Sequence, residues 1–316
     1  MHAFHLPAPL PGLPDYESIL QIVYQFVIAR TVKSQLLNSV YFVRTENMVN
    51  YFNRIVALRY FWFTLVYNDF RNRYRRSFLG VAWSLARPIG MTIVLCIVFS
   101  TFIKDTSASY APFLFTGIAM WQFLTESILL GCTCFGEGAP YLRQQPVPVL
   151  IFPLRVVLAA SIHLVISLAI AMVLTAIFIG LPSMTVLVAL APALVVVFCL
   201  GIGLATLSGL MHTHFTDTKH LLEILLQALY FLTPIIYKPQ MMLENRAKLS
   251  WVVVKFNPLN AVLELVRQPL LSGEGGQAGH YADPWSWQLA LMFVGVVSVL
   301  AWLGLRKLEK NLVYWV

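Results

Sequence analysis

Charged residues are scarce in this sequence. Only 11% of its 316 residues are Asp, Glu, Lys or Arg, whereas 59% are hydrophobic. A soluble domain carries about 25% charged residues, so this chain has too few to cover a surface that faces water. The composition excludes a soluble enzyme, a disordered regulator and a secreted disulfide scaffold. It predicts an all-α integral membrane protein that crosses the bilayer several times.

Cysteine is also sparse, and a nucleotide-binding loop is missing. The four cysteines, Cys96, Cys132, Cys134 and Cys199, all lie in apolar runs. Cys132 and Cys134 would lie roughly 200° apart around a helix, at about 100° per residue, so they do not converge on a metal and we expect no metal site. The pattern G-x-x-x-x-G-K-[S/T] occurs nowhere in the 316 residues. We therefore expect no ATPase activity, and no enzyme of another kind, in this chain.

Six apolar segments are long enough, or nearly long enough, to cross a bilayer. A helix needs about 20 residues, at 1.5 Å per residue, to span a hydrocarbon core of roughly 30 Å. The predicted spans are Leu79–Ile103, Ala111–Cys134, Leu154–Ile179, Thr185–Met211, Leu221–Tyr237 and Trp285–Leu305. With both termini in the cytoplasm, 15 Lys and Arg residues fall inside and six outside. This bias favours an N-in, C-in orientation.

Two regions outside the spans have features of their own. Residues 1–54 carry no signal peptide, so we expect a cytoplasmic N-terminal extension. Residues 55–78 carry an apolar stripe opposite charged residues, which predicts an amphipathic helix in the inner headgroup layer. In the predicted transmembrane domain, residues 79–316, the segment 238–284 holds apolar stretches interrupted by prolines and charges. These stretches favour re-entrant helices at the outer side, between the fifth and sixth spans.

Three motifs stand at defined places among these spans. The first is the run Asn68–Pro88, which contains an Arg-Tyr pair, Ser-x-Leu-Gly and Trp-x-x-x-x-Pro. The second is Tyr141–Arg155, and the third comprises Thr216-Asp-Thr-Lys-His-Leu-Leu-Glu, Phe231-Leu-Thr-Pro-Ile-Ile-Tyr237 and Asn257-Pro-Leu259. In this order they resemble the motifs of ABC-2 permeases that export polysaccharides such as O-antigen, capsule and teichoic acid. The resemblance covers residues from about Ile55 to the C-terminus and departs at Thr216, where the family usually has Arg.

The resemblance implies a half-transporter of the bacterial cytoplasmic (inner) membrane. Two copies of the chain would form a homodimeric pathway, and two separate ABC ATPase subunits, which hold the ATP and Mg, would dock beneath it. Cytoplasmic helices would transmit the ATPase movement, and the coupling residues implied are Asp69, Arg71, Arg73, Arg75, Arg76, Tyr141, Arg143 and Asp217. The net charge of +8 does not indicate a nucleic-acid partner, because the basic residues flank apolar segments and face membrane lipids.

Aromatic residues near the outer ends of the first and fifth spans are candidates for the substrate channel. A sugar polymer needs a wide, polar-tolerant path, and aromatic rings bind the apolar faces of pyranose rings while letting them slide. The predicted channel residues are Phe99, Phe102, Trp121, Tyr230, Phe231 and Tyr237. The alternative interpretation is the aromatic belt that membrane proteins carry at the bilayer interface.

Three polar residues lie inside predicted spans at a similar depth. Arg87, Glu126 and His163 would each be about 12 Å from the cytoplasmic boundary, at 1.5 Å per residue. Unpaired charges at that depth are costly, so we expect Arg87 and Glu126 to pair, within one copy or between two. The site would be the cytoplasmic mouth, where a pyrophosphate-linked lipid head enters, and direct binding of phosphate by Arg87 is the alternative.

The sequence favours the membrane permease of an ATP-driven exporter for a lipid-linked, O-antigen-like polysaccharide. An ABC-2 permease for a smaller drug or lipid is the alternative. A membrane-embedded glycosyltransferase is favoured less, because it needs a convergent acidic or histidine-based site. The aspartates beyond the N-terminal extension are Asp69, Asp105, Asp217 and Asp283, and no two are close in sequence.

Overall fold

The computed structural model describes residues 48–75, 82–100, 110–144, 147–180, 184–239, 254–271 and 282–315. The chain divides into two compact units, Met1–Ala57 and Leu58–Val316. In the first unit the structure describes one helix, α2 (Met48–Ala57). All contacts discussed below lie within the second unit.

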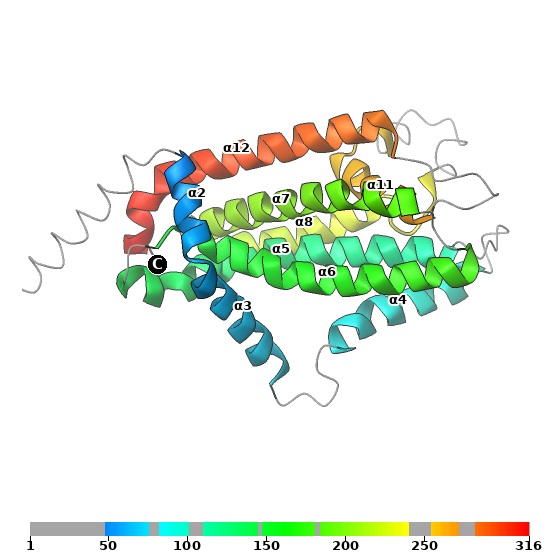
Figure 1. The fold of residues 1–316 in the computed structure, drawn as a ribbon, viewed down its shortest axis with the longest axis horizontal. Coiled ribbons are helices and arrows are strands. Elements are labelled where there is room, and N and C mark those ends of the chain that lie inside the picture. Colours follow the sequence, from blue (N-terminus) through cyan, green and yellow to red (C-terminus); the bar gives the residue numbers. More distant parts are fainter. Residues whose placement is uncertain are drawn as a thin grey trace, which may run out of the picture. The chain divides into compact units, whose positions relative to one another are not determined.

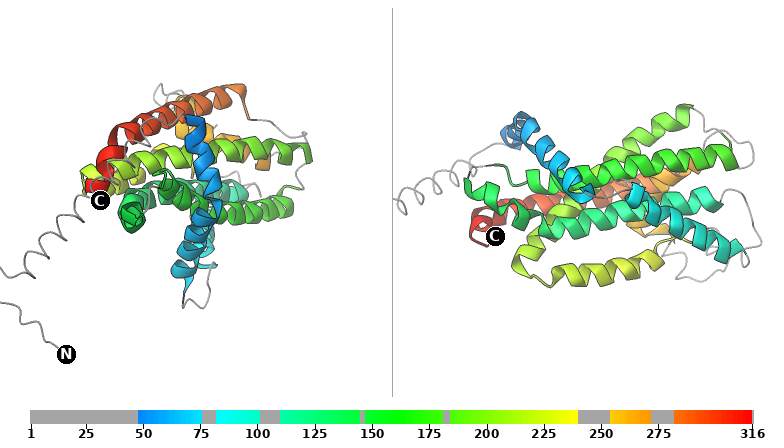
Figure 2. Two further views of the ribbon diagram at one scale, coloured as in Figure 1. Left: turned by 60° about the vertical axis from the view of Figure 1, so that its left-hand side comes forward. Right: turned by 90° about the horizontal axis from the view of Figure 1, so that it is seen from below.

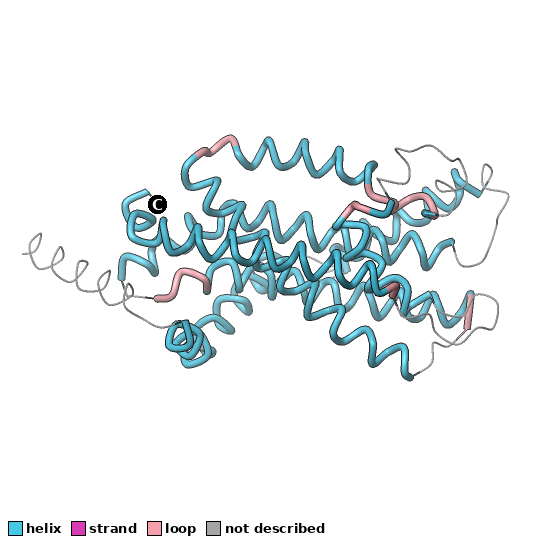
Figure 3. Tube along the Cα trace, turned by 90° about the horizontal axis from the view of Figure 1, so that it is seen from above, coloured by secondary structure: helices cyan, strands magenta, loops and turns pink. Residues whose placement is uncertain are grey.

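The described residues of the second unit are helical apart from short turns and loops, with no strand among them (Figure 3). Its helices are α3 (Arg59–Tyr74), α4 (Ala82–Ser100), α5 (Tyr110–Gln144), α6 (Ile151–Phe178), α7 (Met184–His214), α8 (Thr218–Leu232), α11 (Pro258–Leu271) and α12 (Pro284–Trp315). Helices α5, α6, α7 and α12 run side by side, and α5 packs against both α6 and α7 (Figures 1 and 2). The prediction of an all-helical membrane protein is confirmed.

Four helices are long and apolar enough to cross a membrane. They are Tyr110–Gln144, Ile151–Phe178, Val188–His214 and Pro284–Lys307. These helices contain or largely cover the second, third, fourth and sixth predicted spans. The first predicted span corresponds to α4, whose apolar part, Trp83–Phe99, is shorter. The count of six spans stays a prediction.

The fifth predicted span ends earlier than expected. Leu221–Tyr237 was expected to be one apolar helix, but α8 stops at Leu232 and Thr233 has an extended backbone with ψ of 136°. The reason is Pro234, because a proline disfavours helical geometry at the residue before it and cannot donate a backbone hydrogen bond.

The helix predicted over residues 55–78 is also bounded differently. Helix α2 ends at Ala57 and α3 runs from Arg59 to Tyr74, while residues 76–78 lie outside the described part of the chain. The predicted apolar stripe is divided as well. Phe70 and Tyr74 contact the ring of His163 on α6, whereas Phe63 and Tyr67 on the same predicted stripe are exposed. Helix α3 therefore packs on α6 through a face that mixes aromatic and charged residues.

Small residues allow α5 and α7 to approach closely. A methyl group added at Gly131 of α5 would lie 2.7 Å from the Cα of Ala205, and one added at Gly209 of α7 would lie 2.7 Å from the carbonyl oxygen of Gly131. At the same contact, the Ser208 hydroxyl donates to the carbonyl of Ile128 at 2.9 Å. Such small-residue contacts are typical of helix packing in lipid, where van der Waals contact and interhelical hydrogen bonds replace the hydrophobic effect.

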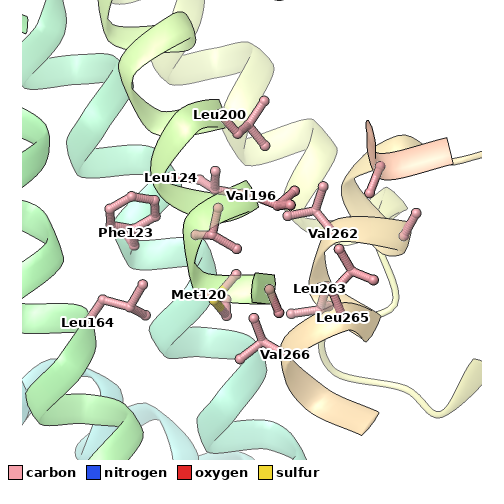
Figure 4. Packing of buried hydrophobic residues seen from close by; sticks show 14 of the residues in the cluster. Met120, Phe123, Leu124, Leu164, Val196, Leu200, Val262, Leu263, Leu265 and Val266 are labelled. Carbon is pink, nitrogen blue, oxygen red and sulfur yellow. The ribbon is translucent and has the colours of Figure 1, made fainter. Parts of the chain in front are cut away.

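Helix α11 is short but deeply buried. Its apolar side chains lie in one cluster with those of four other helices, α5, α6, α7 and α12. Figure 4 shows Met120, Phe123 and Leu124 of α5, Leu164 of α6, Val196 and Leu200 of α7, and Val262, Leu263, Leu265 and Val266 of α11. The side chains of α11 are thus surrounded by protein over most of the helix, as a short helix at membrane depth requires.

Candidate functional site

A buried arginine joins three helices near the start of α6. The side chain of Arg155 is 5% exposed, and its Nη2 lies 2.5 Å from Oε2 of Glu137 on α5. Its Nε lies 3.4 Å from Oδ2 of Asp69 on α3. The planar guanidinium has donors in several directions, which suits it to bridge two carboxylates from separate elements. We call Asp69, Glu137 and Arg155 the Arg155 triad.

The two carboxylates of the Arg155 triad remain in contact with solvent. The Asp69 side chain is 36% exposed and that of Glu137 is 56% exposed. Burial raises the pKa of the Asp69 carboxyl above its usual range, and the nearby Arg155 guanidinium only partly opposes this shift. The cation is thus the member of the triad that depends most on its partners, because it has the least access to water.

His163 is the centre of a second polar cluster between α3 and α6. Its imidazole is buried, and the ring of Phe70 stacks on it at 4.9 Å between centroids. The Tyr74 hydroxyl lies 3.1 Å from Nε2, and Nη1 of Arg73 lies 3.5 Å from the same nitrogen. Since a guanidinium can only donate, its contact favours the tautomer in which Nε2 carries no proton.

The same Arg73 supplies the cation for Glu126. Its Nη1 lies 3.4 Å from Oε2 of Glu126, and Gln122 donates to the other carboxylate oxygen at 3.0 Å. The structure therefore corrects the predicted pairing within one copy, because no ion pair joins Glu126 to Arg87 in the described part of the chain. Arg87 is exposed on α4. A pair between two copies stays a prediction.

Glu126 and His163, which the sequence analysis assigned to the cytoplasmic mouth, are thus brought together by a residue from α3. We call Phe70, Arg73, Tyr74, Glu126 and His163 the mouth cluster. Arg73 had been expected only to couple the ATPase. Its contacts with Glu126 and His163 could not be predicted from a sequence pattern, because only the tertiary fold brings α3 against α5 and α6.

Three of the predicted channel residues form a continuous aromatic series. Trp121 of α5 meets Tyr230 of α8 edge to face at 5.7 Å, and Tyr230 meets Phe231 at 5.4 Å. Phe231 is 62% exposed. The Tyr237 hydroxyl donates to the backbone carbonyls of Phe231 and Leu232, at 3.3 and 3.2 Å, so it lies beside the end of α8.

Phe99 does not join this series. It is partly buried and packs against a separate group formed by Tyr110, Phe113 and Leu114 at the start of α5. Phe102 lies outside the described residues.

The predicted coupling residues fall into two groups. Asp69 and Arg73 hold α6 and α5 as described above, and Tyr141 meets Phe61 of α3 edge to face at 5.7 Å. The others are exposed at the surface, namely Arg71, Arg75, Arg143 and Asp217. Arg76 lies outside the described residues. Within the described ranges, no three His, Cys, Asp or Glu side chains gather as metal ligands would.

Two important residues of this region were not proposed from the sequence. Arg155 and Glu137 have roles that only their contacts reveal, although one signal was available. Arg155 follows Pro153 at the start of an apolar run, and a charge in that position requires a partner of opposite sign.

Long apolar helices with polar clusters between them define a multi-pass membrane protein. Residues 60–271 match the family described as ABC-2 type transporter, and the chain belongs to this family. A member of this family is the membrane component of a transporter.

Similar proteins have been named for a transport process. Two proteins of Klebsiella pneumoniae, both named O-antigen export system permease protein RfbA, are 24% and 22% identical to the chain over 210 and 205 residues, in each case 65% of this chain and 78% of the relative. A Myxococcus xanthus protein of the same name is 23% identical over 217 residues, which cover 68% of this chain and 82% of the relative.

Proposed function

We propose that this chain is the membrane permease subunit of an ATP-driven exporter that moves a lipid-linked polysaccharide across the bacterial cytoplasmic (inner) membrane. The observation that carries the proposal is the similarity to three O-antigen export permeases over about two thirds of this chain and about four fifths of theirs. Membership of the ABC-2 family supports the transporter class independently.

The topology that we propose has six spans with both termini in the cytoplasm. Helices α4 and α8 supply the first and fifth spans beside the four long helices. Helix α11 is a re-entrant helix on the outer side, where its burial against α5 and α7 supports shielding from lipid. The excess of Lys and Arg on the inner side of this arrangement supports the orientation.

The energy comes from a separate ABC ATPase, and we propose two copies of each chain in the complex. Helix α3 presents Arg71 and Arg75 on its exposed side, while Asp69 and Arg73 hold its other side to α6 and α5. A displacement of α3 by the ATPase is then passed to both spans through charged contacts. Arg155 strengthens this transmission, because it joins α3 to the inner end of α5.

The substrate follows a path from the mouth cluster to the aromatic series. Arg73 and the exposed Arg87 offer guanidinium groups that suit the phosphates of a lipid carrier. The rings of Trp121, Tyr230 and Phe231 lie further toward the outer side, where they suit the apolar faces of sugar rings. Exposure of Phe231 leaves its ring available to a substrate or to a second copy of the chain.

The test is to co-express the chain with the ABC ATPase encoded beside it and to delete its gene in the native host. We expect a stable complex that hydrolyses ATP, with a rate that rises when the lipid-linked glycan is added. In the deletion strain we expect full-length polysaccharide to accumulate on the inner leaflet. A complex whose ATPase subunit carries a substituted phosphate-loop lysine is the control.

Three outcomes would overturn the proposal. Surface polysaccharide that is unchanged in the deletion strain would exclude its export by this chain. Stimulation of the ATPase by small amphipathic drugs and not by glycan would favour the alternative of a smaller substrate. Shortened chains, in place of accumulated full-length polymer, would indicate a glycosyltransferase.

A further inference from the structure

The end of α8 leaves backbone carbonyls that the helix itself does not satisfy. Pro234 stops the helix, so the carbonyl groups of Pro234, Ile235 and Ile236 point away from regular helical partners. Ile235 is fully buried and Ile236 is half-buried. Unsatisfied carbonyls in such surroundings cost several kcal/mol each, so each needs a donor from elsewhere in the protein.

Two side chains donate to these three consecutive carbonyls. Nη1 of Arg267 lies 2.9 Å from the oxygen of Pro234, and Nη2 lies 3.4 Å from that of Ile235. The hydroxyl of Tyr110 donates to the oxygen of Ile236 at 3.0 Å. Arg267 belongs to α11 and Tyr110 to the start of α5, so the end of α8 is held from both sides.

Arg267 is buried to a degree that is unusual for a charged residue. It is 1% exposed, and its guanidinium carbon lies 3.7 Å from the centre of the Phe113 ring on α5. Glu264, one turn earlier on α11, lies 3.7 Å from Nη1. A carboxylate, an aromatic face and two carbonyls thus compensate the charge, as a buried cation requires.

A glycine on α5 makes room for this guanidinium. A methyl group added at Gly117 would overlap Nη2 of Arg267 and would lie 3.2 Å from the Ile235 side chain. Helix α5 therefore approaches both α11 and the end of α8 at this one position.

The other end of α11 holds the same segment. The side-chain oxygen of Asn257 accepts from the backbone nitrogen of Leu259 at 3.0 Å and so caps α11, with Pro258 at the first helical position. The side-chain nitrogen of Asn257 donates to the hydroxyl of Thr233 at 3.2 Å. This contact gives a physical reason for the two motifs around Thr233 and Asn257 to occur in one chain.

We propose that Arg267 is a positioning residue for export, in addition to the function proposed above and resting on it. Arg267, with Asn257, fastens Thr233–Ile235 to α11 and α5, an arrangement that we call the α8–α11 clasp. Tyr230 and Phe231 lie a few residues before the clasp, so it sets where these rings stand relative to Trp121 of α5. Through this contact the outer end of α8 moves with α5 and α11 as one body and keeps the pathway closed at rest.

The experiment compares Arg267→Met, which keeps the length of the side chain, with Arg267→Lys, which keeps its charge but loses the two-pronged donor. Gly117→Ala disturbs the same contact while leaving Arg267 in place. The matched controls are Lys255→Met, an exposed cation just before α11, and Gly136→Ala, a glycine of α5 with open space around it.

Two properties are measured for the complex with its ATPase, besides assembly and ATP hydrolysis. One is export of glycan in cells, and the other is release of a small dye from proteoliposomes without ATP. We expect Arg267→Met to lower export and to raise dye release by about tenfold each, because two hydrogen bonds to a charged donor are lost. Arg267→Lys should be intermediate, Gly117→Ala should resemble Arg267→Met, and the controls should match the parent.

ATP hydrolysis and assembly should stay within about twofold of the parent, since the clasp lies at the end opposite to the ATPase. Unchanged export and dye release would overturn the proposal. A parallel fall in assembly, hydrolysis and export would also overturn it, because Arg267 would then serve only the fold. If Arg267→Met fails to accumulate, Arg267→Lys and Gly117→Ala decide by the same readouts. A parent complex that exports no glycan would refute the proposed function. The α8–α11 clasp would still be tested by dye release, because that measurement needs no substrate.

Discussion

Removing the two carboxylates of the Arg155 triad, singly and together, tests how a buried charge holds α3 to the membrane helices. The changes are Asp69→Asn and Glu137→Gln. Each single change leaves Arg155 with one carboxylate, at 2.5 Å or 3.4 Å. The double change leaves a cation that is 5% exposed without a carboxylate partner in the triad.

The magnitudes follow from the exposure of each partner. Asp69 and Glu137 are each more than a third exposed, so either single change should cost up to about 1 kcal/mol, as for surface ion pairs. Asp69→Asn should lie at the low end, because burial already raises the pKa of this carboxyl and offsets part of its attraction to Arg155. The loss of free energy of unfolding in the double variant should exceed the sum of the two single losses by about 1–3 kcal/mol. The reason is that the double change leaves a buried cation without a carboxylate partner in the triad.

The assay is the free energy of unfolding of the purified permease, titrated with SDS in mixed micelles at neutral pH. The same two changes are then made in an Arg155→Met background. There the non-additive part of the double change should vanish, because no buried cation remains to lose its partners. Additivity within about 0.5 kcal/mol in the parent would refute the reasoning. Coupling of the same size in the Arg155→Met background would refute it as well.

Two further predictions concern other contacts. Gly209→Val should lower the thermal unfolding midpoint of the detergent-solubilised protein and its yield, because a side chain there would meet the carbonyl of Gly131 at 2.7 Å. The control is Gly295→Ala, which has open space around it and should leave both quantities near the parent values. A parent-like midpoint for Gly209→Val would contradict the close packing of α5 and α7. The exchange Arg73→Glu with Glu126→Arg should recover export that either change alone reduces by about two- to fivefold, as expected for a partly exposed pair. If the double variant exports no better than the weaker single variant, the two residues do not act as a pair.

The helices themselves could largely be predicted from the sequence. Runs of apolar residues longer than about 20 can be stable in lipid only as helices, so four long helices followed from length and composition. The C-terminal end of α8 could also be predicted from the sequence, because Pro234 stops the helix locally. Hydropathy alone extends the apolar segment past this proline to Tyr237. The cap of α11 by Asn257 and Pro258 is likewise a local pattern.

The pairing of charges could not be predicted in the same way. Arg87 and Glu126 were matched by depth alone, and depth does not tell which neighbouring helix faces a carboxylate. The actual cation, Arg73, is 53 residues away in sequence and reaches Glu126 because α3 lies against α6. The contacts of Arg155 and Arg267 are of the same kind.

The sequence by itself determined that this chain lies in a membrane as a set of helices, because the scarcity of charge leaves no other stable arrangement. It also determined that each charge inside an apolar segment needs a partner, since burial of an isolated charge is too costly. Only the tertiary structure decided the partners, among them Arg73 for Glu126 and the Pro234 and Ile235 carbonyls for Arg267. The physical reason is that a low dielectric makes a partner necessary for a buried charge at every position. The packing of helices that are distant in sequence then determines which groups are close enough to be that partner.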